Sequence, residues 1–445
     1  MQPIALEQLY TIFLSCPTGV CTDTRKIQPG CLFIALKGAN FNGNRFATQA
    51  LEQGAAFVLV DEVVDIAPQH HDQVLYTPDC LHTLQDLARL HRTKFTIPVI
   101  AIGGSNGKTT TKELTARVLS KRYKTYFTPG NLNNHIGVPL TLLAMPLDTE
   151  MAVVELGANH EQETWDLCQI ALPNYGVVTN IGLDHLEGFG SLEGVARANA
   201  ELYQFLAMHH HLAFVNENEE ALVEMAQNIL HHYIPYRVDI NPTRHSFFSL
   251  QAQASPLFVR FTTDTKQTID TQLYGQYNLH NIATALCIGR FFKVAEADAL
   301  AAVASYTPAN MRSQLVQMGS NTVILDAYNA NPSSMEQALH SFARIDAPHK
   351  VVILGDMLEM GDMSIQEHQK LGTITRELGF ETVLFYGQAI QEALSTHPKA
   401  YYFPDKFSLH NWLQDRQFQH THFLIKGSRG VALETVLPFL DTSNA

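Results

Sequence analysis

The segment with the clearest chemical signature is Gly103–Thr110, which reads GGSNGKTT. It follows an apolar run typical of a strand (VIAI) and precedes a helical pattern, so it connects a strand to a helix. Glycines let backbone N–H groups curl around phosphate oxygens, and the helix N-terminus adds a partial positive charge. The strict phosphate-loop pattern has glycine where this chain has Ile102. The segment nevertheless predicts ATP or GTP binding, with a purely structural glycine-rich turn as the alternative.

Within this segment, Lys108 is expected to reach the terminal phosphates, and the hydroxyl of Thr109 is expected to hold Mg²⁺. The candidate nucleotide contacts are Gly104, Ser105, Asn106, Gly107, Lys108, Thr109 and Thr110.

Two further sites follow from residue type and position. Glu155 ends the apolar run MAVVEL, at the carboxyl edge of a parallel sheet where ligands bind, so it is a candidate Mg²⁺ ligand or, alternatively, a helix cap. Asn278 and Asn281 are three residues apart and therefore share one face of a predicted helix. Their carboxamides would either read the edge of adenine or cap the helix.

These residues must be positioned by alternating strands and helices, which the chain shows from Pro98 onward. Continuous apolar runs, each followed by a helical pattern, predict mainly parallel sheets covered on both faces. We expect an α/β protein with three domains: a small N-terminal α/β domain (1–95), a central phosphate-loop domain with a doubly wound sheet (96–307) and a Rossmann-like C-terminal domain (308–445). Residues 236–274 lack helical patterns and predict antiparallel strands attached to the central sheet.

Composition narrows the functional classes. The 445 residues include 30 Lys and Arg against 43 Asp and Glu, a net charge of −13 that argues against a general nucleic-acid or anionic-membrane binder. The six cysteines are scattered without a CxxC pair, and no apolar run approaches the length of a membrane span. The N-terminus lacks the basic region of a signal peptide. We therefore expect a cytoplasmic protein without membrane insertion or nucleic-acid partner, and a monomer.

Distinctive segments occur along the chain: TDTRKIQPGCLFIALKG (22–38), GGSNGKTTTKE (103–113), TPGNLNNHIGVPLTLL (128–143), VVELGANH (153–160), HLEGFGSLEGV (185–195), GQYNLHNIATA (275–285), NMRSQ (310–314), DAYNANPSSM (326–335), LGDMLEMG (354–361) and KGSRG (426–430). Together these motifs resemble the Mur ligase family, the ATP-dependent amide-forming enzymes of peptidoglycan precursor synthesis. The resemblance covers essentially the whole chain, and two of its motifs are far more specific than the phosphate loop.

This resemblance implies a ligase that uses ATP and Mg²⁺ to join D-alanyl-D-alanine to UDP-N-acetylmuramoyl-tripeptide through an acyl phosphate. DAYNANP and GNLNNHIGVPLTLL favour that branch over a ligase that adds a single amino acid or a glutamate to folate. A nucleotide-binding homologue with impaired catalysis is the other alternative.

The resemblance also implies roles for individual residues. His185 would help hold a second metal, although its position alone also fits a loop histidine bonded to a carbonyl. Arg312 would meet the γ-phosphate, and Asp326 would bind the ribose hydroxyls. Substrate contacts are expected at Thr24, Arg25, Asn133, Asn134, His135, Asn329, Asn331, Lys426 and Ser428.

One residue departs from the family pattern. Relatives usually carry a carbamylated lysine that bridges two Mg²⁺ ions on the helix after GFGSLEGV, and this chain has Asn199 there. Asparagine forms no carbamate, and Arg197 lies about 200° around the helix, so it is no substitute. We expect reduced but real activity with a higher demand for Mg²⁺.

Overall fold

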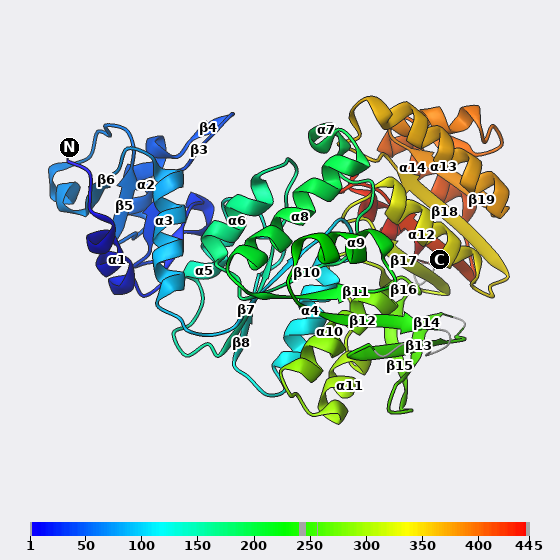
Figure 1. The fold of residues 1–445 in the computed structure, drawn as a ribbon. Coiled ribbons are helices and arrows are strands. Elements are labelled where there is room, and N and C mark those ends of the chain that lie inside the picture. Colours follow the sequence, from blue (N-terminus) through cyan, green and yellow to red (C-terminus); the bar gives the residue numbers. More distant parts are fainter. Residues whose placement is uncertain (1, 240–245, 256, 442–445) are drawn as a thin grey trace. The chain divides into compact units, whose positions relative to one another are not determined.

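The computed structural model describes residues 2–239, 246–255 and 257–441 (Figure 1). This part of the chain forms two compact units: unit 1 contains Met1–Ile102, Tyr123–Ala158 and Gln162–Gly176, and unit 2 contains Gly103–Arg122, Asn159–Glu161 and Val177–Ala445. Both units are α/β with mainly parallel strands, which confirms the predicted fold class. None of the helices in the described ranges combines the length and apolar character that crossing a membrane requires.

The first part of unit 1 is a four-stranded parallel sheet (blue in Figure 1). The apolar runs CLFIAL and AFVLV supply its central strands, whose side chains are largely buried. The strand order is β1 (Val20–Cys21), β2 (Leu32–Ile34), β5 (Phe57–Val60) and β6 (Val74–Tyr76). The accompanying elements are α1 (Leu6–Ser15), α2 (Ala47–Glu52), α3 (Cys80–Thr93) and the hairpin of β3 (Lys37–Gly38) and β4 (Phe41–Asn42).

Unit 1 also contains a set of parallel strands that leads to the phosphate loop. Its order is β8 (Thr125–Phe127), β9 (Met151–Glu155) and β7 (Val99–Gly103), with α5 (Gly137–Leu143) and α6 (Glu163–Ala171) in the same unit. β7 and β9 are fully buried, as their continuous apolar runs predict. Ile102, the residue before the loop, is the register partner of Glu155.

In unit 2, α4 (Lys108–Leu119) follows the phosphate loop and packs against α10 (Asn278–Phe291) and α11 (Glu296–Ala304). α10 also contacts the strands beside it and is buried along most of its length. These strands run in the order β10 (Tyr175–Val178), β11 (Leu212–Asn216), β12 (Tyr233–Asp239), β13 (Phe248–Gln253), β14 (Phe258–Thr263) and β15 (Thr268–Tyr274).

The prediction of antiparallel strands over 236–274 is confirmed for β13, β14 and β15, but it is wrong for β12. β12 pairs in parallel with both β11 and β13, with Tyr236 opposite Phe248. The sequence pattern suggested antiparallel strands throughout, whereas β12 carries on the parallel pairing of β11. Part of the segment, 240–245 and 256, lies outside the described residues.

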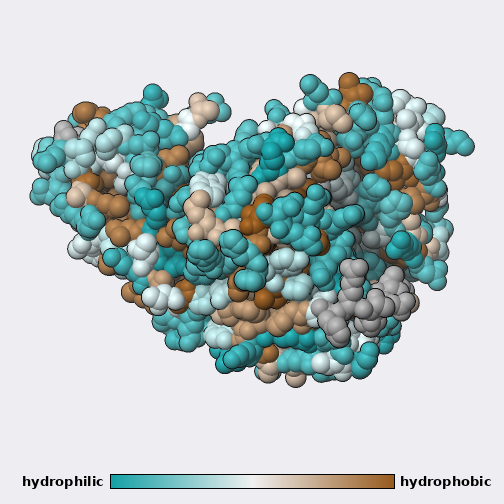
Figure 2. All heavy atoms as spheres, in the orientation of Figure 1, coloured by the Kyte–Doolittle hydropathy of each residue, from teal (hydrophilic) through white to brown (hydrophobic). Residues whose placement is uncertain are grey.

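A second sheet in unit 2 has six strands, all parallel except its first pair. The order is β16 (Gln314–Met318), β17 (Asn321–Asp326), β21 (Thr421–Lys426), β18 (His349–Gly355), β19 (Thr382–Tyr386) and β20 (Tyr401–Phe403). The remaining α-helices of unit 2 are α7 (Leu186–Phe189), α8 (Leu192–Met208), α9 (Glu220–Ile229), α12 (Pro332–Ala343), α13 (Ser364–Leu378) and α14 (Lys406–Arg416). On the face drawn in Figure 2, hydrophilic residues predominate and hydrophobic ones lie in scattered patches.

Candidate active site

The phosphate loop (Gly103–Lys108) depends on two glycines in the left-handed region. Gly104 has φ +116° and Gly107 has φ +80°, conformations that are costly for residues with a Cβ. Space is also lacking, because a Cβ would lie 2.1 Å from the hydroxyl of Thr179 at position 104 and 2.5 Å from Oδ1 of Asn281 at position 107. The sequence GGSNGK therefore produces a tight turn that only this glycine spacing permits.

The segment Thr179–Asp184, here called the β10 loop, anchors the phosphate loop. The N–H of Asn106 donates to Oδ1 of Asn180 at 3.0 Å, and the carbonyl of Asn106 accepts from Thr179 at 2.6 Å. The hydroxyl of Ser105 lies 2.8 Å from Oδ1 of Asp184, which is buried. These bonds fix Ser105 and Asn106 in a defined loop, so the Ser105 side chain and the Asn106 backbone have structural roles alongside the predicted nucleotide contact.

Lys108 and Thr109 open α4 directly after the turn. The ammonium group of Lys108 donates to the carbonyls of Gly104 and Ser105, at 3.1 Å to the latter, and is thereby placed over the loop. Thr109 is buried in the first turn of the helix, next to the half-buried Thr110. The strand, glycine turn and helix occur as predicted.

The two asparagines of α10 have partners within unit 2. Asn278 donates to the carbonyl of Tyr274 at 2.7 Å, and Asn281 donates to Oδ1 of Asn278 at 2.9 Å. Oδ1 of Asn281 accepts from the hydroxyl of Thr111 on α4 at 3.0 Å. Asn281 therefore braces the phosphate-loop helix, and the predicted contact of both residues with adenine stays a prediction.

In unit 1, Glu155 is buried at the end of β9, opposite Ile102. Its backbone N–H donates to Thr128 at 2.9 Å, and Oε1 accepts from Nδ2 of Asn133 at 2.8 Å. Asn133, a predicted substrate contact, therefore orients this carboxylate. A Cβ on Gly157 would lie 2.7 Å from the Asn133 amide, so the glycine of the motif VVELGANH gives that side chain room.

The neighbours of Asn133 also have local roles. Oδ1 of Asn134 accepts from the N–H of Gly137 at 2.8 Å and from that of Ile136, at the start of α5. The carbonyl of His135 accepts from Gln85 at 3.0 Å. Turn chemistry accounts for Asn134 locally, and the predicted substrate role of both residues stays a prediction.

His185 has a left-handed backbone (φ +46°) immediately before α7. Its Nδ1 is bonded to the carboxylate of Glu359, which lies 174 residues away in the motif LGDMLEMG. A carboxylate on one ring nitrogen fixes the orientation of an imidazole, which is the usual support of a metal-binding histidine. The motif was identified from the sequence, but no role was predicted for Glu359.

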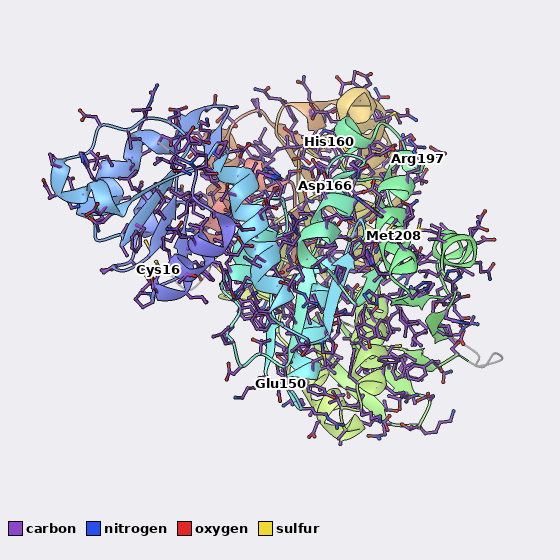
Figure 3. All side chains as sticks on the ribbon, turned by 60° about the vertical axis from the view of Figure 1, so that its left-hand side comes forward. Cys16, Glu150, His160, Asp166, Arg197 and Met208 are labelled. Atoms are coloured by element: carbon purple, nitrogen blue, oxygen red, sulfur yellow. The ribbon has the colours of Figure 1, made fainter. Side chains whose placement is uncertain are left out.

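Asn199 lies on α8, where its amide donates to the carbonyl of Val195 at 2.9 Å. Its Oδ1 is 3.9 Å from where a Cβ on Gly103 would be, so it lies beside the start of the phosphate loop. Arg197, labelled in Figure 3, is 61% exposed and pairs with Glu161 at 2.6 Å. This pairing agrees with the expectation that Arg197 does not replace the missing lysine.

Arg312 lies in a connecting segment with an unusual backbone. Asn310, Met311 and Ser313 all have positive φ, between +49° and +63°, which is uncommon for residues other than glycine. The guanidinium of Arg312 stacks on the ring of Tyr328 at 3.9 Å, a distance typical of cation–π contact. The structure thus holds Arg312 against the motif DAYNANP, and sequence reasoning missed the role of the tyrosine in it.

Asp326 and Lys426 are register partners at the carboxyl ends of β17 and β21. Their ion pair is 2.6 Å long and buried, with 16% of the Asp326 side chain and 3% of the Lys426 side chain exposed. Oδ1 of Asp326 also accepts from the N–H of Ser313 at 2.9 Å, and Lys426 donates to the carbonyl of Asn329 at 3.2 Å. The hydroxyl of Ser313 in turn is 2.6 Å from that of Tyr277, just before α10.

The segment Asn329–Ser334, here called the α12 loop, carries two predicted substrate contacts. Oδ1 of Asn329 accepts from the N–H of Ala330 at 2.9 Å. Asn331 is the N-cap of α12 and contacts the phosphate loop through its amide group. Ser428 is buried and accepts from the N–H of Leu358 at 2.9 Å.

In unit 1, Thr24 and Arg25 form a short 3₁₀ turn (Thr24–Lys26) at the carboxyl end of β1. Asp23 accepts bidentate hydrogen bonds from the Arg25 guanidinium at 2.9 and 2.7 Å and another from its N–H. These hydrogen bonds, above all those from the guanidinium, lower the pKa of Asp23 to about 2. Arg25 remains 87% exposed and is therefore accessible to an anion.

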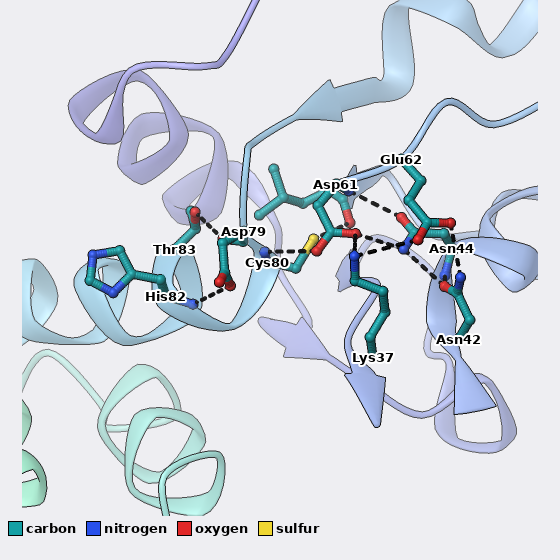
Figure 4. A network of polar contacts seen from close by, with 10 residues as sticks. Lys37, Asn42, Asn44, Asp61, Glu62, Asp79, Cys80, His82 and Thr83 are labelled. Atoms are coloured by element: carbon teal, nitrogen blue, oxygen red, sulfur yellow. Dashed lines mark hydrogen bonds and ion pairs between the residues drawn. The ribbon is translucent and has the colours of Figure 1, made fainter. Parts of the chain in front are cut away.

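A polar network at the same edge of the unit 1 sheet was not predicted (Figure 4). Asp61 follows β5, only 4% of its side chain is exposed, and its carboxylate pairs with Lys37 at 3.2 Å. The carboxylate also accepts from Asn44 at 2.7 Å and from the N–H of Cys80 at 3.2 Å. Lys37 and Asp61 follow the runs CLFIAL and AFVLV, so the rule that ligands bind at carboxyl edges could have identified them.

Three family profiles match the chain in succession. Residues 17–92 match the profile described as "Mur ligase family, catalytic domain", 102–289 match "Mur ligase middle domain", and 311–429 match "Mur ligase, glutamate ligase domain".

Curated proteins and solved structures give the same picture. A "UDP-N-acetylmuramoyl-tripeptide--D-alanyl-D-alanine ligase" from Bacillus subtilis (strain 168) is 34% identical, across 94% of this chain and 92% of its own length. A protein of the same name from Escherichia coli (strain K12) is 35% identical with the same coverage. "Crystal structure I of MurF from Acinetobacter baumannii" superposes with a TM-score of 0.86 at 29% identity, and 99% of each chain is covered.

Proposed function

The chain belongs to the Mur ligase family, and from that premise we propose that it joins D-alanyl-D-alanine to UDP-N-acetylmuramoyl-tripeptide at the expense of ATP. Relatives with that name, similar to this chain along 94% of its length, support the assignment. The product would be the pentapeptide precursor of peptidoglycan, with ADP and phosphate released. The proposed setting is the cytoplasm, with the chain acting as a monomer of three domains at 1–95, 96–307 and 308–445.

The reaction needs two steps, because a carboxylate is a poor electrophile. Transfer of the γ-phosphoryl group to the terminal carboxylate of the tripeptide would give an acyl phosphate. The neutral amine of D-alanyl-D-alanine would then attack the acyl carbon, forming the amide bond as phosphate leaves with the bonding electrons and the nitrogen loses one proton. Exclusion of water protects the acyl phosphate from hydrolysis until the amine arrives.

Residues of unit 2 have the chemistry that the first step requires. Lys108 would exchange the loop carbonyls for phosphate oxygens, which are stronger partners for an ammonium group. Arg312 would leave Tyr328 and meet the γ-phosphate, where a planar guanidinium offers two parallel hydrogen bonds. Asp326 would accept the ribose hydroxyls. Together the two cations would offset the charge on the transferred group.

The donor set also suits Mg²⁺. Thr109 offers a hydroxyl and Glu155 a buried carboxylate beside the strand that enters the phosphate loop. The described residues contain no cluster of three or more His, Cys, Asp or Glu that could hold a metal. Mg²⁺ is commonly bound by one or two carboxylates plus substrate phosphates, so such a sparse set fits it. When bound, Mg²⁺ would neutralise charge on the phosphates; His185 is proposed as a further ligand.

For the UDP-linked substrate, we propose the carboxyl edge of the unit 1 sheet, where Thr24 and the exposed Arg25 follow β1. Lys37, which begins β3 three residues beyond the neighbouring strand β2, adds a second cation to that edge. Arginine and lysine so placed suit a diphosphate. Asn329, Lys426 and the residues around them are proposed to meet the incoming dipeptide.

The observation that carries this proposal is the glycine turn and helix of the phosphate loop, within a chain similar to the named ligases throughout. The test is phosphate release with ATP, Mg²⁺, UDP-N-acetylmuramoyl-tripeptide and D-alanyl-D-alanine, leaving out one component at a time. Release that requires all four supports the ligase. Release with a single amino acid in place of the dipeptide would point to another amide ligase. Nucleotide binding without release would instead indicate a homologue impaired at Asn199.

A further inference from the structure

Three loops of unit 2 meet at the side chain of Asn106. The phosphate loop provides Asn106 itself, the β10 loop contacts its backbone, and the α12 loop contacts its amide. Nδ2 of Asn331 donates to Oδ1 of Asn106 at 2.9 Å, across 225 residues of sequence. This bond is a direct polar link between the phosphate loop and the helix α12 that follows the second sheet's strand β17.

The orientation of the Asn331 amide is set by its second role. As N-cap of α12, Asn331 accepts the N–H of Ser334 through Oδ1 at 2.8 Å, and its own N–H donates to the Ser334 hydroxyl at 3.1 Å. A capping oxygen is needed there because the first N–H groups of a helix lack helical partners. With Oδ1 committed to the helix, Nδ2 is the group that faces Asn106, which must therefore accept.

The β10 loop closes the third side of this junction. The N–H of Leu183 donates to the hydroxyl of Ser333 at 3.1 Å. A Cβ on Gly182 would lie 2.8 Å from that hydroxyl and 3.4 Å from Nδ2 of Asn106, so glycine permits the close approach. Just beyond, Leu186 belongs to the same buried cluster as Met335 of α12. The β10 loop is thus attached to the phosphate loop at one end and to α12 at the other.

We propose that Asn331 is a positioning residue for the phosphate loop: through Asn106 it holds the loop in the shape that receives nucleotide phosphates. This inference rests on the proposed nucleotide site and adds a residue that acts on it from the α12 loop. Because the contact is one neutral hydrogen bond, its loss should weaken nucleotide binding about threefold to tenfold.

The test compares ADP dissociation constants, measured by calorimetry with Mg²⁺, for the full chain and four variants. Asn331→Ser keeps a capping oxygen for α12 but is too short to reach Asn106. Asn106→Ala removes the acceptor and leaves the backbone bonds of the phosphate loop in place. The third variant combines both substitutions. Ser334→Ala is the matched control, because it weakens the same cap without touching the bond between Asn331 and Asn106.

The expected result is a similar loss of ADP affinity for Asn331→Ser and Asn106→Ala, no further loss in the double variant, and unchanged affinity for Ser334→Ala. Wild-type affinity in Asn331→Ser would overturn the inference, as would additive losses in the double variant. An equal loss in Ser334→Ala would show that cap stability, not the contact, is responsible. A wild-type chain that binds no ADP would instead refute the proposed nucleotide site.

Discussion

Because Asp326 and Lys426 form a buried ion pair, removing one partner should lower the free energy of unfolding substantially. The two charged atoms are 2.6 Å apart, and only 3% of the Lys426 side chain is exposed. Coulomb's law with an effective dielectric constant of about 20 gives about 6 kcal/mol of attraction at that distance. Desolvation offsets much of this in the intact pair, but Lys426→Met would leave a carboxylate in a poorly hydrated site with the N–H of Ser313 as a remaining partner.

We expect Lys426→Met to lower the free energy of unfolding by about 3 kcal/mol, near the lower end for broken buried pairs because Asp326 is 16% exposed. At a typical slope of unfolding free energy against urea concentration, this loss of stability lowers the urea concentration at the unfolding midpoint by about 1–1.5 M. The chain has two tryptophans, and Trp412 packs against the core that contains β21. Urea titration of Trp412 fluorescence in a Trp165→Phe background therefore reports on the right part of the fold.

A second variant separates charge from packing. Adding Asp326→Asn to Lys426→Met removes the unpaired charge and keeps an oxygen for the N–H of Ser313, so most of the lost stability should return. The reasoning is refuted if Lys426→Met alone costs less than about 1 kcal/mol, or if the second substitution lowers stability further.

Three other predictions concern the reaction. Lys108→Ala should abolish phosphate release and leave the melting temperature almost unchanged, because the ammonium group donates to the carbonyls of Gly104 and Ser105 within its own loop; an active variant would contradict the site. Asn199→Lys should raise the rate and lower the Mg²⁺ concentration for half-maximal activity, whereas unchanged values of both would show that the carbamate is dispensable here. Arg312→Ala should lower kcat about 100-fold or more with ADP affinity retained, since ADP lacks the γ-phosphate. Arg312→Lys is the matched control, and full activity in it would argue against a role for the planar guanidinium that stacks on Tyr328.

The sequence predicted those parts of the fold that local patterns determine. The apolar runs before Gly103 and through Glu155 became buried parallel strands, because strands covered on both faces need continuous apolar side chains. The glycines of the phosphate loop were also recognisable from local sequence, because the tight turn that needs their left-handed conformation spans only a few residues. The exception is β12, whose parallel pairing depends on its neighbours in the sheet and not on its own pattern.

Most of the site contacts that could not be predicted from the sequence join segments that are far apart along the chain. Glu359 reaches His185 across 174 residues, and Asn331 reaches Asn106 across 225. No spacing rule connects such residues, because their proximity follows from packing of whole elements. Asp61 was closer to prediction, because it directly follows the apolar run AFVLV, at the carboxyl end of a strand where ligands of a parallel sheet bind.

The partners of Asp326 raise the question of whether it has room for a ribose at all. One of its oxygens accepts from Ser313 and the other from Lys426. An ionised carboxylate has about four lone-pair directions, so two further hydrogen bonds, one per ribose hydroxyl, are compatible with both internal ones. The internal bonds then hold the carboxylate in a single orientation. On this reasoning Lys426 and Ser313 prepare Asp326 for the nucleotide and do not compete with it, so Lys426→Met, which removes one of the two internal bonds, should weaken ADP binding even where the chain remains folded.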